Sequence, residues 1–169
     1  MEQLKIPKER IACLIGTKGE TKKLIEKTTR TRIQISSEEG DIIIRSEDPI
    51  KAYLCKEIIK AIGRGFNPKI ALSLTEEGNY LEIIEIKEFA RKTKNDLSRL
   101  KSRLIGKKGK AREEIEKLSN TKLSVHGKTV CIIGKQEELM TARQAIIKLL
   151  QGAKHQNVYF YIKRHAARE

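Results

Sequence analysis

The chain has 169 residues, which suffices for one ordinary domain or two small ones. Lysine and arginine number 36 against 22 acidic residues, giving a formal net charge of +14. Because the basic residues are spread along the chain, this excess favours a polyanionic partner such as a nucleic acid, although a basic protein without one stays an alternative. No run approaches the roughly 20 apolar residues of a membrane-spanning helix, which argues against contact with a membrane.

The cysteines and the first residues indicate the cellular compartment of the protein. The three cysteines lie in apolar stretches without a C-x-x-C pair, so they predict small core residues in a reducing compartment instead of a disulfide scaffold or a zinc site. The opening segment "MEQLKIPKER" lacks the apolar block of a signal peptide. We therefore expect a cytoplasmic protein with no metal site and no cofactor.

The elements of the first half follow in a clear order. A short apolar strand precedes a helix that Gly16 ends, and a second helix is predicted at residues 21–29. The alternating stretches "TRIQIS" and "IIIRS", joined by the turn "SEEGD", predict a hairpin. Asp48 and Pro49 are typical of the start of a closing helix. Its expected inward face comprises Ile50, Leu54, Ile58 and Ile62.

The second half repeats this order. "YLEIIEI" at residues 80–86 predicts a strand, and helices are predicted at 95–105 and 111–118. "TKLSVHG" and "KTVCIIG" predict a hairpin, and a third helix is expected at 136–150. Each half is thus strand, helix, loop, helix, strand, strand, helix, which predicts the α+β class.

The two halves are a tandem duplication. "LIGTKGETKKLIEKTTRTRIQI" at residues 14–35 aligns without gaps on "LIGKKGKAREEIEKLSNTKLSV" at 104–125. We predict a first domain at 1–66, and a second at 80–169 that includes a C-terminal helical extension. Residues 67–79 would form a connection with a short helix. Because this connection is apolar, we expect the two domains to pack against each other.

Both copies carry a Gly-x-x-Gly loop in front of a charged helix. Two glycines three residues apart let the backbone turn sharply and leave no Cβ in the way of a ligand. The following helix offers free N–H groups and its positive dipole end, and basic residues surround it, which favours a phosphodiester backbone. The candidate RNA-binding residues are Ile15, Gly16, Thr17, Lys18, Gly19, Lys22, Lys23 and Ile33, with Ile105, Gly106, Lys107, Lys108, Gly109, Lys110, Arg112 and Leu123 in the second copy.

This arrangement resembles the KH domain of the type I (eukaryotic-type) fold, with βααββα order in each copy. The resemblance implies that the Gly-x-x-Gly loop clamps single-stranded nucleic acid. It also implies that apolar residues line or support the groove for the bases, namely Ile15, Ile25, Ile33 and Ile35, and Ile105, Ile115, Leu123 and Val125. Lys22 and Arg112 depart from the pattern, because an apolar residue usually stands there at the groove floor. This departure favours contacts with the RNA backbone or with structured RNA over a standard base-binding pocket.

Two short sequence motifs outside the loops make the resemblance more specific. Residues 64–68, "RGFNP", and residues 152–159, "GAKHQNVY", resemble the Partner of Nob family of two-KH ribosome assembly factors. The chain lacks the long N-terminal extension of eukaryotic members and is therefore expected to be archaeal. The resemblance implies binding near the 3′ end of small-subunit ribosomal RNA and assistance to the endonuclease that matures it, a possible protein partner. Phe66 and residues 159–161 are candidates for a partner surface, although at least two of the three aromatic residues in 159–161 are expected to close the core.

Other functions compete with this one. An enzyme is not expected, because the sequence has no phosphate-binding P-loop motif, no carboxylates paired next to a histidine and only three aspartates. Alternatives within the binding class are a tandem KH regulator of mRNA, a subunit of an RNA-degradation complex, and a protein-interaction scaffold with vestigial loops. His155 is expected to be a helix cap or a packed polar residue.

Overall fold

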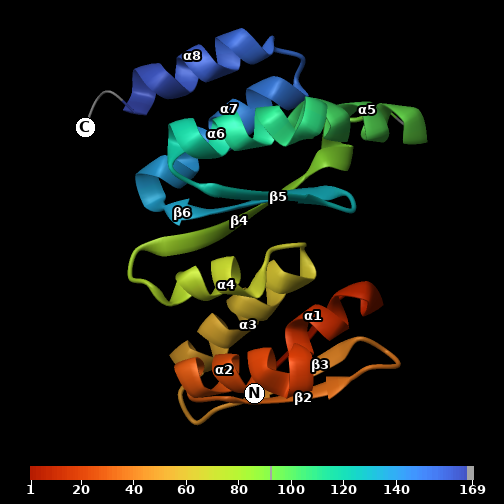
Figure 1. Cartoon of the computed structure of the whole chain (residues 1–169), viewed down its shortest axis with the longest axis vertical. Helices are drawn as coiled ribbons and strands as arrows, with labels where there is room; N and C mark the ends of the chain where they lie inside the picture. Colours follow the sequence, from red (N-terminus) through yellow and green to blue (C-terminus); the bar gives the residue numbers. More distant parts are fainter. Residues whose placement is uncertain (92, 167–169) are drawn as a thin grey trace. The chain divides into compact units, whose positions relative to one another are not determined.

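The computed structural model describes residues 1–91 and 93–166 (Figure 1). The chain divides into two compact units, Met1–Glu77 and Gly78–Glu169. Each unit is a three-stranded antiparallel sheet with helices over one face. Among the described residues, no helix has both the length and the apolar character required to cross a membrane.

The first unit has the predicted order of elements. Its sheet runs β1-β3-β2, with both neighbouring pairs antiparallel. Short 3₁₀ turns flank α1, at Lys8–Arg10 and Thr17–Gly19. The main elements are β1 (Glu2–Lys5), α1 (Ile11–Ile15), α2 (Glu20–Thr29), β2 (Arg32–Ser36), β3 (Asp41–Arg45) and α3 (Pro49–Gly63).

The closing helix α3 begins as predicted but buries a different face. The Asp48 side chain accepts a hydrogen bond from the N–H of Ile50, and Pro49 occupies the first turn. The prediction that Ile50 faces inward is wrong, because its side chain is 78% exposed. Residues four apart drift by about 40° per step on an α-helix, so Ile50 lies about 120° from Ile62. The core-facing residues follow a three- and four-residue spacing instead: Ala52, Cys55, Ile58, Ile59 and Ile62.

The segment after α3 returns to the core of the first unit. Phe66 is only 2% exposed, so the prediction that it contributes to a partner surface is wrong. Arg10 fixes this return, since its Nε donates to the Ile62 carbonyl and its guanidinium donates to the Phe66 carbonyl, both at 2.8 Å. Asn67 then caps the short helix α4 (Pro68–Ala71) by accepting from the Lys69 N–H. A 3₁₀ turn, Leu72–Thr75, follows α4.

The second unit repeats the order, with a longer first strand, first helix and third strand. Its sheet runs β4-β6-β5, again antiparallel throughout. One further helix, α8, follows the repeated elements. The elements are β4 (Asn79–Glu85), α5 (Lys94–Ile105), α6 (Lys110–Ser119), β5 (Lys122–His126), β6 (Thr129–Lys135), α7 (Gln136–Leu150) and α8 (His155–Ala166).

The helix α8 lies across α6 and α7, away from the sheet (Figure 1). It is held by Val158 and Ile162, which are both fully buried. His155 is a packed polar residue, as expected, and its Nε2 lies 2.8 Å from the Arg103 carbonyl oxygen. In the aromatic run 159–161, the first and last side chains pack on the core while Phe160 is 72% exposed, which agrees with the expectation for these residues.

Candidate nucleic-acid interface

The two Gly-x-x-Gly loops have the same backbone conformation. Gly16 and Gly106 have φ values of 75° and 73°, with ψ close to 175° in both. The residues between the glycines form a tight 3₁₀ turn, in which Lys18 and Lys108 have left-handed φ values of 54° and 55°. A positive φ is uncommon for a lysine, so the second copy has kept an unusual turn in full.

The two glycines of each loop are needed for different reasons. A Cβ on Gly106 would lie 2.6 Å from the Ala111 Cβ and 2.7 Å from the Ala111 nitrogen, so the loop packs directly against the next helix. Gly16 is equally close to Thr21. A Cβ on Gly109 would meet nothing nearer than 4.0 Å, and this glycine is required by its φ of 77°. The first glycine therefore sets the packing, while the second leaves the approach to the helix open.

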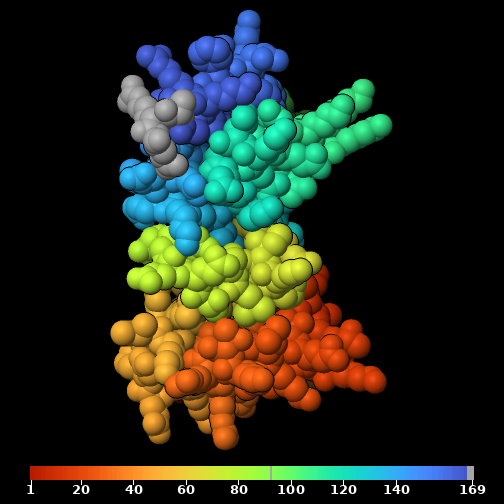
Figure 2. All heavy atoms as spheres, turned by 60° about the vertical axis from the view of Figure 1, so that its left-hand side comes forward, coloured from red at the N-terminus to blue at the C-terminus, as the bar shows by residue number. Residues whose placement is uncertain are grey.

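The loops present positive charge to solvent. Thr17, Lys18, Lys107 and Lys108 are all exposed, and so are Lys23 and Lys110 on the first turns of α2 and α6. In the described part of the chain, none of these lysines has a carboxylate oxygen within 4.0 Å. Figure 2 shows long side chains projecting into solvent from both units. Unpaired lysines at the N-terminus of a ten-residue helix form a suitable site for a phosphate.

A groove lies beside the loop in the first unit. It is lined by Ile15 at the end of α1, by Lys22 on α2, and by four residues of β2 and the turn that follows: Ile33, Gln34, Ile35 and Ser37. Its volume of about 390 Å³ falls within the range typical of small-molecule clefts, about 300–1,000 Å³, so a nucleobase can enter. The predicted residues Ile15 and Ile33 are thus brought together with Lys22.

Burial separates the residues that line the site from those that support it. Ile25 and Ile115 are fully buried in the cores of their units. Ile33, which lines the groove, and its counterpart Leu123 are both 4% exposed, whereas Ile15 and Ile105 are half-buried beside their loops. Among the described residues, no group of three or more His, Cys, Asp or Glu side chains is placed to hold a metal ion.

The structure adds one pair of residues that sequence reasoning missed. Glu26 accepts a hydrogen bond from the Ile33 N–H at 3.0 Å, and Glu116 accepts one from the Leu123 N–H at 2.9 Å. The other carboxylate oxygen lies 3.7 Å from Lys22 in the first unit and 3.7 Å from Arg112 in the second. The two basic residues that depart from the KH pattern are thus partners of an acid that ties the loop helix to the groove strand. The sequence contained one signal for this pair: both copies have a glutamate at the same aligned position, Glu26 and Glu116, 90 residues apart.

Replacing Glu116 with alanine should destabilise the second unit by about 1–3 kcal/mol, because the Leu123 N–H would lose its acceptor. The measurement is urea unfolding of the full chain. Glu113 is exposed on the same helix, and its replacement with alanine should change stability by less than about 0.5 kcal/mol. Equal stabilities of the two variants would show that the carboxylate does not hold the strand.

Comparisons with known domains agree with this geometry. The profile of the Eukaryotic type KH-domain (KH-domain type I) matches residues 80–167, and the profile of the KH domain matches residues 1–61. The fold and the paired loops therefore define the class: the chain is a tandem KH protein.

Known relatives indicate to which family of tandem KH proteins the chain is similar. A KH domain-containing protein of Methanocaldococcus jannaschii is 42% identical over 168 residues, which are 97% of this chain and 73% of that protein. The pre-rRNA-processing protein pno1 of Aspergillus fumigatus is 30% identical over 115 residues, which are 67% of this chain and only 46% of that protein. A chain in the crystal structure of the a/eIF2alpha-aDim2p-rRNA complex from Pyrococcus horikoshii is 45% identical. The structural match covers 99% of this chain and 94% of that chain, with a TM-score of 0.92.

The chain belongs to the Partner of Nob family, in its archaeal form. This confirms the resemblance drawn from the loops and from the phrases at residues 64–68 and 152–159.

Proposed function

We propose that this protein binds small-subunit ribosomal RNA near its 3′ end and assists pre-rRNA processing and ribosome assembly without catalysing a reaction itself. The observation that carries the proposal is the duplicated loop, which has the same conformation in both units and presents exposed lysines in each. The names of the relatives support the choice of RNA, since one is a pre-rRNA-processing protein and another was crystallised with rRNA.

Each loop would act as a clamp on the phosphodiester backbone. The loop and first-turn N–H groups face the phosphate, and the two loop side chains of the second unit, Lys107 and Lys108, add charge. In the first unit, Thr17 and Lys18 supply one hydroxyl and one charge. The groove beside Ile15 and Ile33 would then accept a base next to the clamped phosphate. All of these groups bind and orient RNA, which fits a role as an assembly factor.

The test is binding of single-stranded RNA from the 3′ end of small-subunit rRNA, compared with a scrambled sequence, by fluorescence anisotropy. Changing Lys107 and Lys108 to aspartate should weaken binding at least about 100-fold, because two charge-assisted contacts are lost and a repulsion is gained. The same comparison with Thr17 and Lys18 changed to aspartate shows which unit contributes more.

A matched control removes the same charge elsewhere in the second unit. Lys117 and Lys128 are exposed and lie outside the loop, so their double change to aspartate should have a much smaller effect. If both loop variants bind RNA as the unchanged protein does, the clamps are not the binding site and the proposal is wrong. Binding that does not weaken as salt rises would contradict the electrostatic part of the argument.

The proposal places the protein in the cytoplasm, where its three free cysteines stay reduced. The endonuclease that matures the same RNA is proposed as a protein partner, on the strength of the family resemblance. Co-purification of the two proteins with and without ribonuclease treatment distinguishes a direct contact from one bridged by RNA.

A further inference from the structure

The first unit has a basic cavity at the end of α2 opposite the loop. Its four cationic residues come from different elements: Arg30 after α2, Arg32 on β2, Arg45 on β3 and Lys51 on α3. The cavity measures about 810 Å³, and its only acidic lining residues are Glu47 and Asp48. The ten residues of α2 span about 15 Å, so this cavity is separate from the clamp.

Two of the arginines are placed directly opposite each other. Arg32 and Arg45 are paired in the register of β2 with β3, and both are exposed. Like charges opposite each other on neighbouring strands destabilise a sheet. In the described residues neither has an acidic partner within 4.0 Å, since Asp48 pairs with Lys51 at 3.8 Å and caps α3. The free protein therefore keeps an uncompensated repulsion at this position.

The third arginine is also kept at a conformational cost. Arg30 follows α2 with a left-handed φ of 53°, a position where glycine or asparagine is usual. The second unit has Asn120 there, with a φ of 54°. Three arginines thus surround one cavity, although two repel each other and one occupies a disfavoured backbone conformation.

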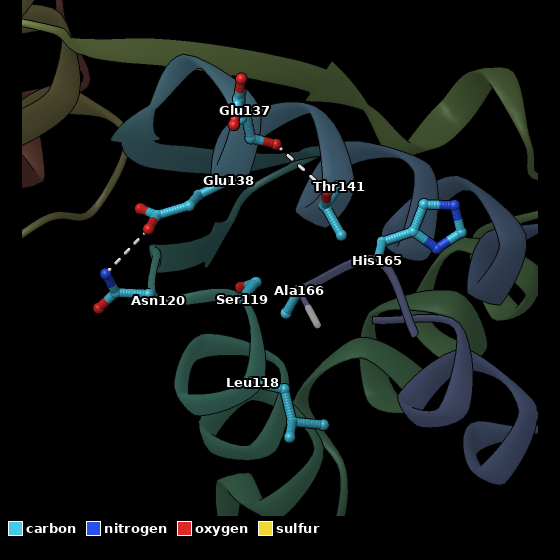
Figure 3. Close-up of a pocket in the computed structure, with 8 residues that line it drawn as sticks. All are labelled: Leu118, Ser119, Asn120, Glu137, Glu138, Thr141, His165 and Ala166. Atoms are coloured by element: carbon cyan, nitrogen blue, oxygen red, sulfur yellow. Dashed lines mark hydrogen bonds between the residues drawn. The ribbon is translucent and has the colours of Figure 1, made fainter. Parts of the chain in front are cut away.

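The end of α6 in the second unit corresponds to the end of α2, but the cavity beside it has a different lining. This cavity is lined by Asn120, Glu137 and Glu138 and by the end of α8 at His165 (Figure 3). Asn120 donates to the Glu138 carboxylate at 3.1 Å. Arg30 thus corresponds to Asn120, which contacts a carboxylate, whereas Arg32 corresponds to another basic residue, Lys122.

We propose that Arg30, Arg32, Arg45 and Lys51 form a second phosphate-binding site, which holds the RNA backbone outside the clamp of the first unit. This inference rests on the proposed function, because it takes the same RNA as the ligand. Guanidinium groups contact phosphates through two parallel hydrogen bonds, and two arginines on neighbouring strands are spaced to share one phosphate or to hold two in succession. A bound phosphate would remove the repulsion between Arg32 and Arg45.

The test replaces Arg32 and Arg45 with glutamine in the full chain and measures binding of the rRNA 3′-end oligonucleotide across a range of salt. Binding should weaken about tenfold, and the slope of log affinity against log salt should fall by about 0.7 if the arginines share one phosphate of a single strand and by about 1.4 if they hold two. The melting temperature should stay the same or rise, because a repulsion is removed. Changing the exposed Lys8 and Lys69 to glutamine removes the same charge from the same unit and should leave the slope nearly unchanged.

Spectra of the arginine Nε–H groups and of the loop amides separate the two proposals. RNA should shift the signals of Arg32 and Arg45 together with those of residues 16–19. Shifts of the loop alone, or a double variant no weaker than the lysine control, would overturn the second site and leave the clamp standing. Shifts of the arginines alone would support the second site and contradict the clamp in this unit, and no shift in either would overturn both.

Discussion

Replacing Gly106 with alanine should destabilise the second unit by several kcal/mol and abolish the clamp conformation. The added Cβ would lie 2.6 Å from the Ala111 Cβ and 2.7 Å from its nitrogen, and φ is 73°. The left-handed conformation alone costs about 1–2 kcal/mol for a residue with a Cβ. The clash adds to this cost, because backbone at the start of α6 has to move. Urea unfolding and the loop amide signals measure the two effects.

Gly109→Ala is the matched control, since it makes the same chemical change in the same loop. Its Cβ would meet nothing closer than 4.0 Å, so only the cost of the positive φ, about 1–2 kcal/mol, is expected. The first unit offers the same pair of substitutions, at Gly16 and Gly19. If the two alanine variants of one loop are equally stable, the packing of the first glycine against the next helix does not determine the loop.

Phe66→Ala should cost the first unit about 3–5 kcal/mol, which is the usual range for removing a buried phenylalanine side chain. Phe66 is 2% exposed, and its carbonyl accepts from Arg10, so the cavity would form where the chain returns to the core. Thermal unfolding of the full chain followed by circular dichroism should show the first unit melting at a lower temperature.

Phe160→Ala removes the same atoms from a side chain that is 72% exposed. We expect a change within about 0.5 kcal/mol. A loss of stability comparable with that of Phe66→Ala would contradict the burial seen in the structure.

The order of elements and the conformation shared by the loops were predictable from the sequence. Gly16 and Gly106 stand at the same place in two aligned stretches, and local periodicity on either side of them identifies helices and strands. A loop flanked by two helices is fixed mainly by residues close in sequence, which explains why the pattern was sufficient there.

Features that depend on distant residues were not predictable in this way. Phe66 is buried in the core, and its carbonyl accepts a hydrogen bond from Arg10, 56 positions earlier. Glu26 stands four residues after Lys22, a spacing typical of an ion pair on a helix surface, and only the position of β2 reveals its bond to Ile33. Arg32 of β2 and Arg45 of β3 become neighbours only through the register of the two strands, and the number of charges along the chain does not reveal that register.

Because the second unit needs α8 to complete its core, the two units become able to fold at different times during synthesis. Every residue of the first unit has been made once residue 77 is added, whereas the core of the second unit stays incomplete until Val158 and Ile162 are available. At roughly 5–20 residues per second, the interval between residue 77 and residue 162 lasts about 4–17 s. The first unit therefore has time to fold on the translating ribosome before the second unit can close its core.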